Sequence, residues 1–354
     1  MSDSNNIQTL CASIQQANTS QQALQIQGGG SKLFYGNQIS ATALDVSTNK
    51  GIVEYEPSEL YITARNGTLL TDIEATLEDN HQILPFEPPH FSSQATLGGT
   101  IACGLSGPRR PYASSLRDCV LGTHIINGKG EHLEFGGKVM KNVAGYDASR
   151  LMCGAFGTLG VLTQISIRVA PKPHTEITLA IETNQSEALY KMNAWTQTQL
   201  PISATYFNDG VLYIRVAGLE KTTKKMQQEI GGETVPDSKA FWTAIKDHQT
   251  DFFQTKLPLW RVIVPNNTPT LAIKGDSCLE WNGGLRWIKS IDDAQHTEKQ
   301  CQAARGHATL FKAESKPIDC LANINPNLKK LHLNLKSAFD PNQILNPGRM
   351  YSWY

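Results

Sequence analysis

A run of three glycines followed by a serine and a lysine is the first part of this chain that could do chemistry. The run is Gly28-Gly29-Gly30-Ser31-Lys32, and it follows a short apolar segment that favours a β-strand. Successive glycines allow the backbone to turn several N–H groups toward one point, which is how proteins build an anion-binding nest. The run therefore predicts a pyrophosphate site, and an ordinary tight turn is the competing interpretation.

Two further glycine-rich segments follow in the first half of the chain. One contains Leu97-Gly98-Gly99-Thr100, where small side chains would let a ligand approach the backbone and amides at a helix start could face a phosphate. Close helix packing would explain the same residues. The other comprises residues 141–147 and 157–161. Because a fold can bring separate loops to one ligand, the three segments together indicate one large, phosphate-bearing cofactor.

Two common phosphate-binding motifs are absent from the sequence. A Rossmann Gly-x-Gly-x-x-Gly would need glycine at the position of Leu33. The nearest match to a Walker motif runs from Gly122 to Lys129, but five residues separate its glycines where four are required, and Gly130 replaces the Ser or Thr. A nicotinamide enzyme or a nucleoside triphosphatase of standard design is therefore disfavoured.

Composition narrows the class of protein further. The chain has 354 residues, which predicts two domains, and its 32 basic and 32 acidic side chains give a formal net charge of zero. This neutrality removes the usual argument for a nucleic-acid partner. With 40% hydrophobic and 18% charged residues, the sequence is typical of a globular protein.

The seven cysteines are scattered, and no two of them form a Cys-x-x-Cys pair. This spacing argues against a zinc ribbon, an iron–sulfur cluster and a redox dithiol, so we expect no metal site. A protein that handles electrons without such ligands needs an organic cofactor or a partner's cluster. The sequence contains no apolar run of the roughly 20 residues that a transmembrane helix needs, and residues 1–6 do not resemble a signal peptide, so we expect a cytoplasmic location.

The elements that must position these segments follow an α+β pattern. Apolar spacing predicts helices around residues 7–14 and 69–77, and a strand at 24–27. Asn127-Gly128-Lys129-Gly130 predicts a hairpin between strands at 119–126 and 131–135.

The second half of the chain is expected to form a separate α+β region. A stop at Pro171-Lys172-Pro173 marks the main domain boundary. A strand at 175–182 and a helix at 186–198 are predicted after it. The last helix, at 327–338, should end before Asp340-Pro341, because proline disfavours helix in the preceding residue.

The combination of motifs resembles the FAD domain of the vanillyl-alcohol-oxidase-type flavoproteins, and more narrowly the FAD-binding subunits of glycolate oxidases. The match is dense over residues 24–172, thin from 175 to 320, and strong again at the C-terminus. The segments that carry the resemblance are 28–32, 97–100, 104–110, 139–147, 157–161 and 340–350.

The resemblance implies an α+β fold with a PCMH-type FAD-binding domain of two α+β subdomains at residues 1–172. An α+β cap domain would occupy 173–325, and residues 326–354 would pack back on the FAD domain. By position, residues 28–32 and 97–100 would hold the pyrophosphate through backbone amides, and residues 141–147 and 157–161 would line the adenine and isoalloxazine parts. The cofactor-binding residues implied in this way are Gly28, Gly29, Gly30, Ser31, Lys32, Leu97, Gly98, Gly99, Thr100, Asn142, Val143, Ala144, Gly145, Tyr146, Asp147, Gly157, Thr158, Leu159, Gly160, Val161 and Asn346.

The first loop also bears on how the flavin would be held. In members of this family with a flavin bonded to histidine, a histidine often follows the glycines of the first loop. Ser31 occupies that place here, so we expect non-covalent FAD.

Oxidation of a 2-hydroxy acid moves a hydride from the α-carbon to flavin N5 while a base takes the hydroxyl proton. The substrate carboxylate favours a guanidinium, whose planar fork matches it in bidentate fashion. The candidates for these roles are Arg261, Arg286 and His307, and for each a structural role is the competing interpretation.

One departure from the family bears on activity. The larger, catalytic flavin subunits carry a histidine-rich, Gly-Asp-Gly-Asn-type stretch in the cap, and residues 175–340 contain nothing of that form. The preferred hypothesis is therefore an FAD-binding subunit of a complex that oxidises glycolate to glyoxylate. Its partners would be a catalytic flavin subunit and an iron–sulfur subunit that receives the electrons, and the complex could hold the chain peripherally at the inner membrane.

Three alternatives remain open. The chain could be a stand-alone FAD-dependent dehydrogenase of another hydroxy acid, a sugar or a lactone. Such a dehydrogenase would share the FAD domain and differ from the preferred hypothesis only in the cap. The chain could also keep the flavin fold as a scaffold without chemistry, although the glycine-rich loops argue against this. A nucleic-acid-binding module fits the neutral composition least well.

Overall fold

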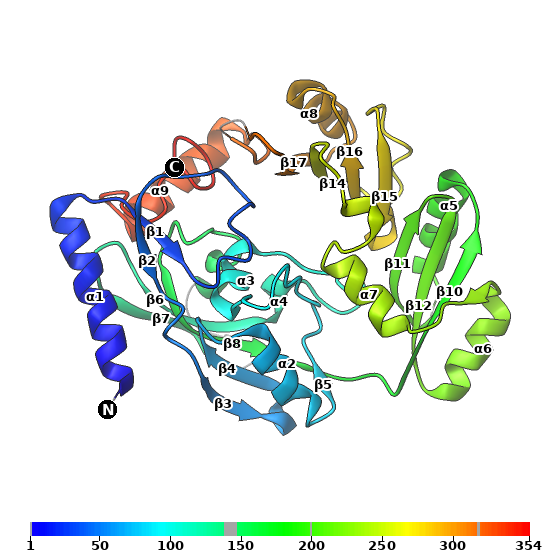
Figure 1. Cartoon of the computed structure of the whole chain (residues 1–354), viewed down its shortest axis with the longest axis horizontal. Coiled ribbons are helices and arrows are strands. Elements are labelled where there is room, and N and C mark those ends of the chain that lie inside the picture. The colour runs from blue at the N-terminus through cyan, green and yellow to red at the C-terminus, as the bar shows by residue number, and fades with distance from the viewer. Residues whose placement is uncertain (1, 138–146, 199, 317–318) are drawn as a thin grey trace. The chain divides into compact units, whose positions relative to one another are not determined.

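The chain folds into two units, each built around its own β-sheet (Figure 1). The computed structural model describes residues 2–137, 147–198, 200–316 and 319–354. The two units are composed as follows: unit one of Met1–Leu105, Leu116–Pro171 and Pro317–Tyr354, and unit two of Ser106–Ser115 and Lys172–Lys316.

The main sheet of unit one has the strand order β3-β4-β8-β6-β7, with every neighbouring pair antiparallel. Its central strands are rich in the β-branched residues that suit a pleated, buried surface. The predicted Asn-Gly-Lys-Gly hairpin is confirmed, because it joins β6 to β7. The strands are β3 (Ile52–Glu56), β4 (Tyr61–Arg65), β6 (Val120–Ile126), β7 (His132–Gly136) and β8 (Val161–Arg168).

Two helices cover this sheet and form the core with it. Helix α2 (Leu70–Glu78) buries Leu70, Ile73 and Leu77, which confirms the predicted apolar face. Helix α3 (Leu97–Cys103) buries Leu97 and Ile101 in the same hydrophobic cluster. The shorter elements of unit one are β5 (Gln82–Ile83), β9 (Ala170–Pro171) and α4 (Leu116–Cys119).

A second, smaller layer joins the two ends of the chain. Strands β1 (Leu24–Gln27) and β2 (Thr42–Asp45) pair in parallel, and helix α1 (Ser2–Ser20) packs its apolar residues against them. Helix α9 (Pro326–Phe339) begins at the N-cap Asn325 and ends before Asp340, as predicted. After α9 the chain returns to β1, where the N–H of Leu24 donates to the Ile344 carbonyl at 2.7 Å.

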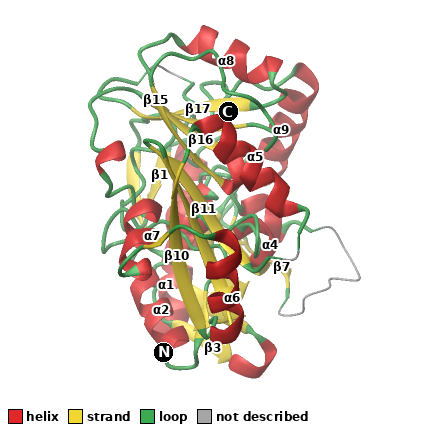
Figure 2. Cartoon of the chain, turned by 90° about the vertical axis from the view of Figure 1, so that its right-hand side faces the viewer, coloured by secondary structure: helices red, strands yellow, loops and turns green. Residues whose placement is uncertain are grey.

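Unit two contains an antiparallel sheet with the order β13-β10-β12-β11-β15-β16-β14-β17 in the described residues. Helices α5 and α6 pack on one face of the β10–β12 region, and α7 lies against the other (Figures 1 and 2). The expected α+β character is confirmed. The strands are β10 (Thr175–Glu182), β11 (Ile202–Asn208), β12 (Val211–Gly218), β13 (Glu233–Thr234), β14 (Leu259–Ile263), β15 (Asp276–Glu280), β16 (Leu285–Lys289) and β17 (His307–Lys312); the helices are α5 (Gln185–Thr196), α6 (Glu220–Ile230), α7 (Ser238–Lys246) and α8 (Ala294–Ala303).

One short segment of the first half belongs to unit two. Residues Ser106–Ser115 leave unit one after α3 and return to it before α4. The Trp281 indole N–H donates to the Gly107 carbonyl at 2.9 Å, and Arg109 forms an ion pair with Glu176. No sequence pattern predicted this excursion.

Candidate cofactor site

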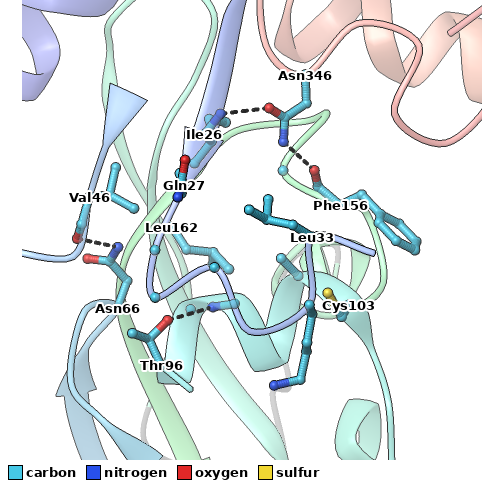
Figure 3. A pocket seen from close by; sticks show the side chains of 18 of the residues that line it. Ile26, Gln27, Leu33, Val46, Asn66, Thr96, Cys103, Phe156, Leu162 and Asn346 are labelled. Carbon is cyan, nitrogen blue, oxygen red and sulfur yellow. Dashed lines mark hydrogen bonds between the residues drawn. The ribbon is translucent and has the colours of Figure 1, made fainter. Parts of the chain in front are cut away.

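The principal pocket of unit one contains about 810 Å³ of empty space, including solvent at its mouth. Side chains from β1, α3, β8 and the C-terminal segment surround the space (Figure 3). The residues that line it are Gln25, Ile26, Gln27, Gly28, Gly29, Gly30, Ser31, Lys32, Leu33, Val46, Asn66, Thr96, Gly98, Gly99, Ala102, Cys103, Phe156, Gly157, Gly160, Leu162, Asn346 and Arg349.

The glycine run forms one wall of this pocket directly after β1. Within the described part of the chain, the backbone N–H groups of residues 28–31 donate no hydrogen bond to another residue. Lys32 is only 5% exposed, and its ammonium lies 3.3 Å from Ser31 Oγ and 3.5 Å from the His90 carbonyl. Backbone N–H groups without a protein acceptor, beside a buried ammonium, are suitable hydrogen-bond donors to a pyrophosphate.

Close packing explains why this run must be glycine. A Cβ on Gly29 would lie 1.5 Å from the Gln94 carbonyl oxygen, and one on Gly28 would lie 2.8 Å from Thr96 Oγ1. Gly30 has a φ of +72°, a conformation that side chains disfavour. The loop therefore sits against the segment that leads into α3.

The amides in the first turn of α3 donate to acceptors within the protein. The N–H of Leu97 donates to Thr68, that of Gly98 to Asn66, and those of Gly99 and Thr100 to Thr96. These bonds engage the amides of this turn, and the binding of pyrophosphate by the backbone of residues 97–100 stays a prediction. Gly98 instead lets α3 approach Asn66, because a Cβ there would lie 2.7 Å from Asn66 Cβ.

Asn346 reaches the pocket from the C-terminal segment. Its Oδ1 accepts the N–H of Ile26 at 2.7 Å, and its Nδ2 donates to the Phe156 carbonyl at 2.6 Å (Figure 3). Gly157 follows with a φ of +71°, and a Cβ there would lie 2.8 Å from Asn346 Nδ2. The side chain of Asn346 therefore ties β1 to the turn at residues 156–157.

Arg349 fixes the chain beyond the glycine run. Its guanidinium donates to the carbonyls of Leu33 at 2.8 Å and Tyr35 at 2.7 Å, and also to that of Asn37. Burial lowers the pKa of Arg349, which is only 7% exposed. The residue lies within the C-terminal motif, but its part in the pocket was not predicted.

Asn66 is a pocket residue that no sequence motif indicated. Its Nδ2 donates to the Val46 carbonyl at 3.2 Å, and its Oδ1 accepts from Asn49 at 2.6 Å. The Thr163 carbonyl accepts both the N–H of Asn66 and the side-chain amide of Asn49. These contacts join residues far apart in the sequence.

The expected cofactor residues divide into four groups, one of which holds Asp147 alone. Those that line the pocket are Gly28, Gly29, Gly30, Ser31, Lys32, Gly98, Gly99, Gly157, Gly160 and Asn346. Those that are buried beside it without lining it are Leu97, Thr100, Thr158, Leu159 and Val161. Asp147 is exposed and pairs with Arg150 at 3.2 Å. Those that lie outside the described residues are Asn142, Val143, Ala144, Gly145 and Tyr146.

The three candidate catalytic residues lie in unit two, and the structure does not bring them together. Side chains alternate between the faces of a strand, and Val262 pairs with Arg286 whereas Ile263 pairs with His307. Arg261 and His307 therefore share one face of the sheet, and Arg286 lies on the other.

Arg286 is held by backbone carbonyls. Its guanidinium donates to Gly283 at 3.1 Å, to Pro269 at 2.7 Å and to Thr268, and burial lowers its pKa to about 10. A guanidinium engaged in this way is not placed to receive a substrate carboxylate. Arg261 has a different environment. Its guanidinium lies 5.4 Å from the centroid of the Trp281 ring.

The pocket lining offers few groups that titrate near neutral pH. No His, Asp or Glu lines the pocket among the described residues. The Cys103 thiol does line it, and burial raises its pKa even though the charges of Lys32 and Arg349 oppose the shift. Across the described ranges, no group of three or more His, Cys, Asp or Glu side chains could hold a metal ion. No described helix combines the length and apolar character that a membrane crossing requires.

Comparison with known proteins first defines the class. A family model described as an FAD binding domain matches residues 4–136. The fold is similar to that of 4-ethylphenol oxidase from Gulosibacter chungangensis, with a TM-score of 0.69 and 15% identity over 98% of this chain and 88% of that one. The molecule thus has the α+β fold of that oxidase and contains an FAD binding domain, and the expected fold class is confirmed.

Two relatives then narrow the class to a family. The chain is 44% identical over 345 residues to glycolate oxidase subunit GlcE of Escherichia coli (strain K12), covering 98% of this chain and 97% of that protein. It is also 34% identical over 128 residues to glycolate oxidase subunit GlcD of Bacillus subtilis (strain 168), covering 36% of this chain and 27% of that protein. The chain belongs to the GlcE family of glycolate oxidase subunits, which confirms the resemblance seen in its motifs.

Proposed function

We propose that this pocket holds FAD non-covalently and that the chain is the FAD-binding subunit of a complex that oxidises glycolate to glyoxylate. The main support for the cofactor site comes from the backbone N–H groups of residues 28–31. They donate to no described residue, and they lie beside the buried ammonium of Lys32. Similarity to GlcE over nearly the whole of both chains supports the substrate and the complex. In this proposal unit one is the FAD domain and unit two is the cap.

The residues of unit one would divide the cofactor between them. The amides of residues 28–31 and the Lys32 ammonium would hold the pyrophosphate. Asn346 uses one N–H of its amide group on Phe156, so its second N–H is available to a polar atom of the flavin ring. Gly157, which lines the pocket, would let the ring lie close to the backbone.

Non-covalent attachment is supported by the nucleophiles that the pocket offers. Serine occupies position 31, and no histidine lines the pocket among the described residues. Cysteine reacts as its thiolate, and the raised pKa keeps the Cys103 thiol protonated at neutral pH.

A division of labour with partner subunits is the second part of the proposal. When bound, FAD accepts a hydride from the α-carbon of a hydroxy acid. The described lining of this pocket contains no carboxylate or imidazole that could take the hydroxyl proton. We therefore assign substrate oxidation to a catalytic flavin subunit and the onward transfer of electrons to an iron–sulfur subunit. The chain would act in the cytoplasm, held peripherally at the inner membrane through the complex.

A stand-alone dehydrogenase is the second candidate, and one observation favours it. Arg261 and His307 lie on the same face of the unit-two sheet, where a guanidinium could bind a carboxylate and an imidazole could accept a proton. Within the described residues, the Arg261 guanidinium makes no ion pair and no hydrogen bond.

The absorption spectrum of the purified chain before and after anaerobic addition of glycolate separates these proposals. Flavin bands that persist in their oxidised form support the subunit that depends on a catalytic partner. Prompt bleaching identifies a dehydrogenase in its own right. Absence of flavin bands from the folded chain refutes the cofactor site. Yellow colour that stays in the pellet after acid precipitation refutes non-covalent attachment.

A further inference from the structure

We propose that Lys336 is a positioning residue that holds Asn346 and the adjacent turn in place for the cofactor. The proposal rests on the proposed function, since it assumes that the pocket receives FAD. Lys336 lies on the inner face of α9 and does not line the pocket. It acts through the backbone on either side of residues that do.

The Lys336 ammonium is wholly committed to three acceptors. It donates to the Thr158 carbonyl, the Leu345 carbonyl and Asp340 Oδ2, each at 2.8 Å. The side chain is only 1% exposed. An ammonium has three donors, so all of them are engaged. The two carbonyls belong to the residues next to Gly157 and Asn346, both of which line the pocket.

Asp340 completes the arrangement from the end of α9. Its buried carboxylate accepts the N–H of Ile344 at 3.1 Å and that of Leu345 at 2.8 Å. The peptide groups before and after Leu345 are therefore held by opposite charges, the first through its N–H and the second through its carbonyl. Asn346 follows directly, and its own N–H donates to the Leu24 carbonyl at 2.9 Å, so the ion pair and β1 together set its backbone position.

A purely structural role does not account for this ion pair. Two buried charges gain little stability over an apolar pair of the same volume, because both must be removed from water. A charge-assisted hydrogen bond restricts the position of a carbonyl more than an apolar contact does, so the ion pair fixes the positions of the carbonyls that it binds. The two restricted carbonyls are those of Thr158 and Leu345. They lie next to the turn at residues 156–157 and to Asn346, whose Nδ2 contacts that turn. A shift of this clamp would weaken the bonds from Asn346 to Ile26 and Phe156.

A double-mutant cycle tests whether Lys336 acts through Asn346. The dissociation constant of FAD is measured by titrating the flavin-free full chain, its K336M and N346A variants, and the K336M/N346A variant. We expect K336M to weaken FAD binding about tenfold in the unmodified background, the factor expected for the loss of one well-placed hydrogen bond. In the N346A background we expect K336M to change the affinity less than about twofold, because residues that act in series are not additive.

Two further variants separate positioning from folding. K336M leaves the Asp340 carboxylate buried without its cation, so K336M/D340N restores charge balance while still lacking the two donations to carbonyls. We expect this variant to regain thermal stability without regaining FAD affinity. The control is L77A in α2, which opens a cavity in the core of the same unit away from the pocket and should lower the melting temperature without weakening FAD binding.

The proposal is overturned if K336M/D340N binds FAD as tightly as the unmodified chain. It is also overturned if K336M lowers the affinity by the same factor in both backgrounds, or if L77A weakens FAD binding as much as K336M does. Failure of the unmodified, folded chain to bind FAD refutes the proposed function and removes this proposal with it. Tight FAD binding by the unmodified chain together with any of the first three outcomes refutes only the role of Lys336.

Discussion

Replacing Gly157 with alanine tests whether Asn346 shapes the pocket, and Gly154 provides a matched control. Both glycines belong to one short segment and both have positive φ, +71° at Gly157 and +77° at Gly154. An alanine at either position meets the same backbone penalty. The two sites differ in what the new Cβ would contact. At Gly157 it would lie 2.8 Å from Asn346 Nδ2, whereas at Gly154 the nearest atom, Gly104 Cα, is 4.0 Å away.

The magnitude follows from these contacts. The left-handed conformation costs an alanine about 1–2 kcal/mol, and we expect G154A to be destabilised by that amount. In G157A the amide of Asn346 must also move, which removes its bonds to Ile26 and Phe156, each with a net value of about 1 kcal/mol. We therefore expect G157A to be destabilised by about 3–4 kcal/mol, summing these two contributions.

Two assays on the same preparations measure the difference. Urea unfolding of the flavin-free chain, followed by circular dichroism, gives the free energy of unfolding. Titration with FAD then gives the affinity, which we expect to fall at least about tenfold in G157A and less than about twofold in G154A. Equal unfolding free energies and equal FAD affinities for the two variants would refute the assignment of Asn346 to the pocket.

Three further predictions concern the glycine loop, a candidate catalytic residue and a buried histidine. G29A should abolish FAD binding in a chain that still folds, because its Cβ would lie 1.5 Å from the Gln94 carbonyl oxygen and the loop must move; FAD titration that shows unchanged affinity would contradict this. R286M should lower stability by about 2–3 kcal/mol without changing FAD affinity, because it removes donors from buried carbonyls; a loss of affinity with unchanged stability would restore a functional role. Burial lowers the pKa of His248 to about 3 in the folded chain. Between that pH and about 6.5 the unfolded chain therefore binds more protons than the folded chain. The free energy of unfolding should fall with falling pH in this window, by up to about 1.4 kcal/mol per pH unit. H248F, which keeps the ring stacking on Phe253, should show a smaller loss between pH 7 and pH 5 in urea unfolding, and an identical loss would show that another group is responsible.

The local features of this protein were determined by its sequence. Glycine runs, the Asn-Gly-Lys-Gly hairpin and the helix that ends before Asp340-Pro341 depend on backbone freedom, turn chemistry and proline sterics within a few residues. The motif at 28–32 was predicted as an anion site, and the structure places it on the wall of the pocket, where the amides of residues 28–31 are unengaged. Such signals are readable because neighbouring residues alone produce them.

The contacts that complete the site were decided only by the tertiary structure. Residues 97–100 carry the same small-residue pattern as a phosphate loop, yet their amides donate to Thr68, Asn66 and Thr96, and nothing local distinguishes the two outcomes. The part played by Arg349 depends on carbonyls more than 300 positions earlier in the chain. The excursion at 106–115 likewise depends on Trp281 and Glu176. A buried polar group is stabilised only when it has a hydrogen-bond partner. In these pairings the partner comes from a distant segment, so the pairing forms only when the tertiary structure brings the two segments into contact.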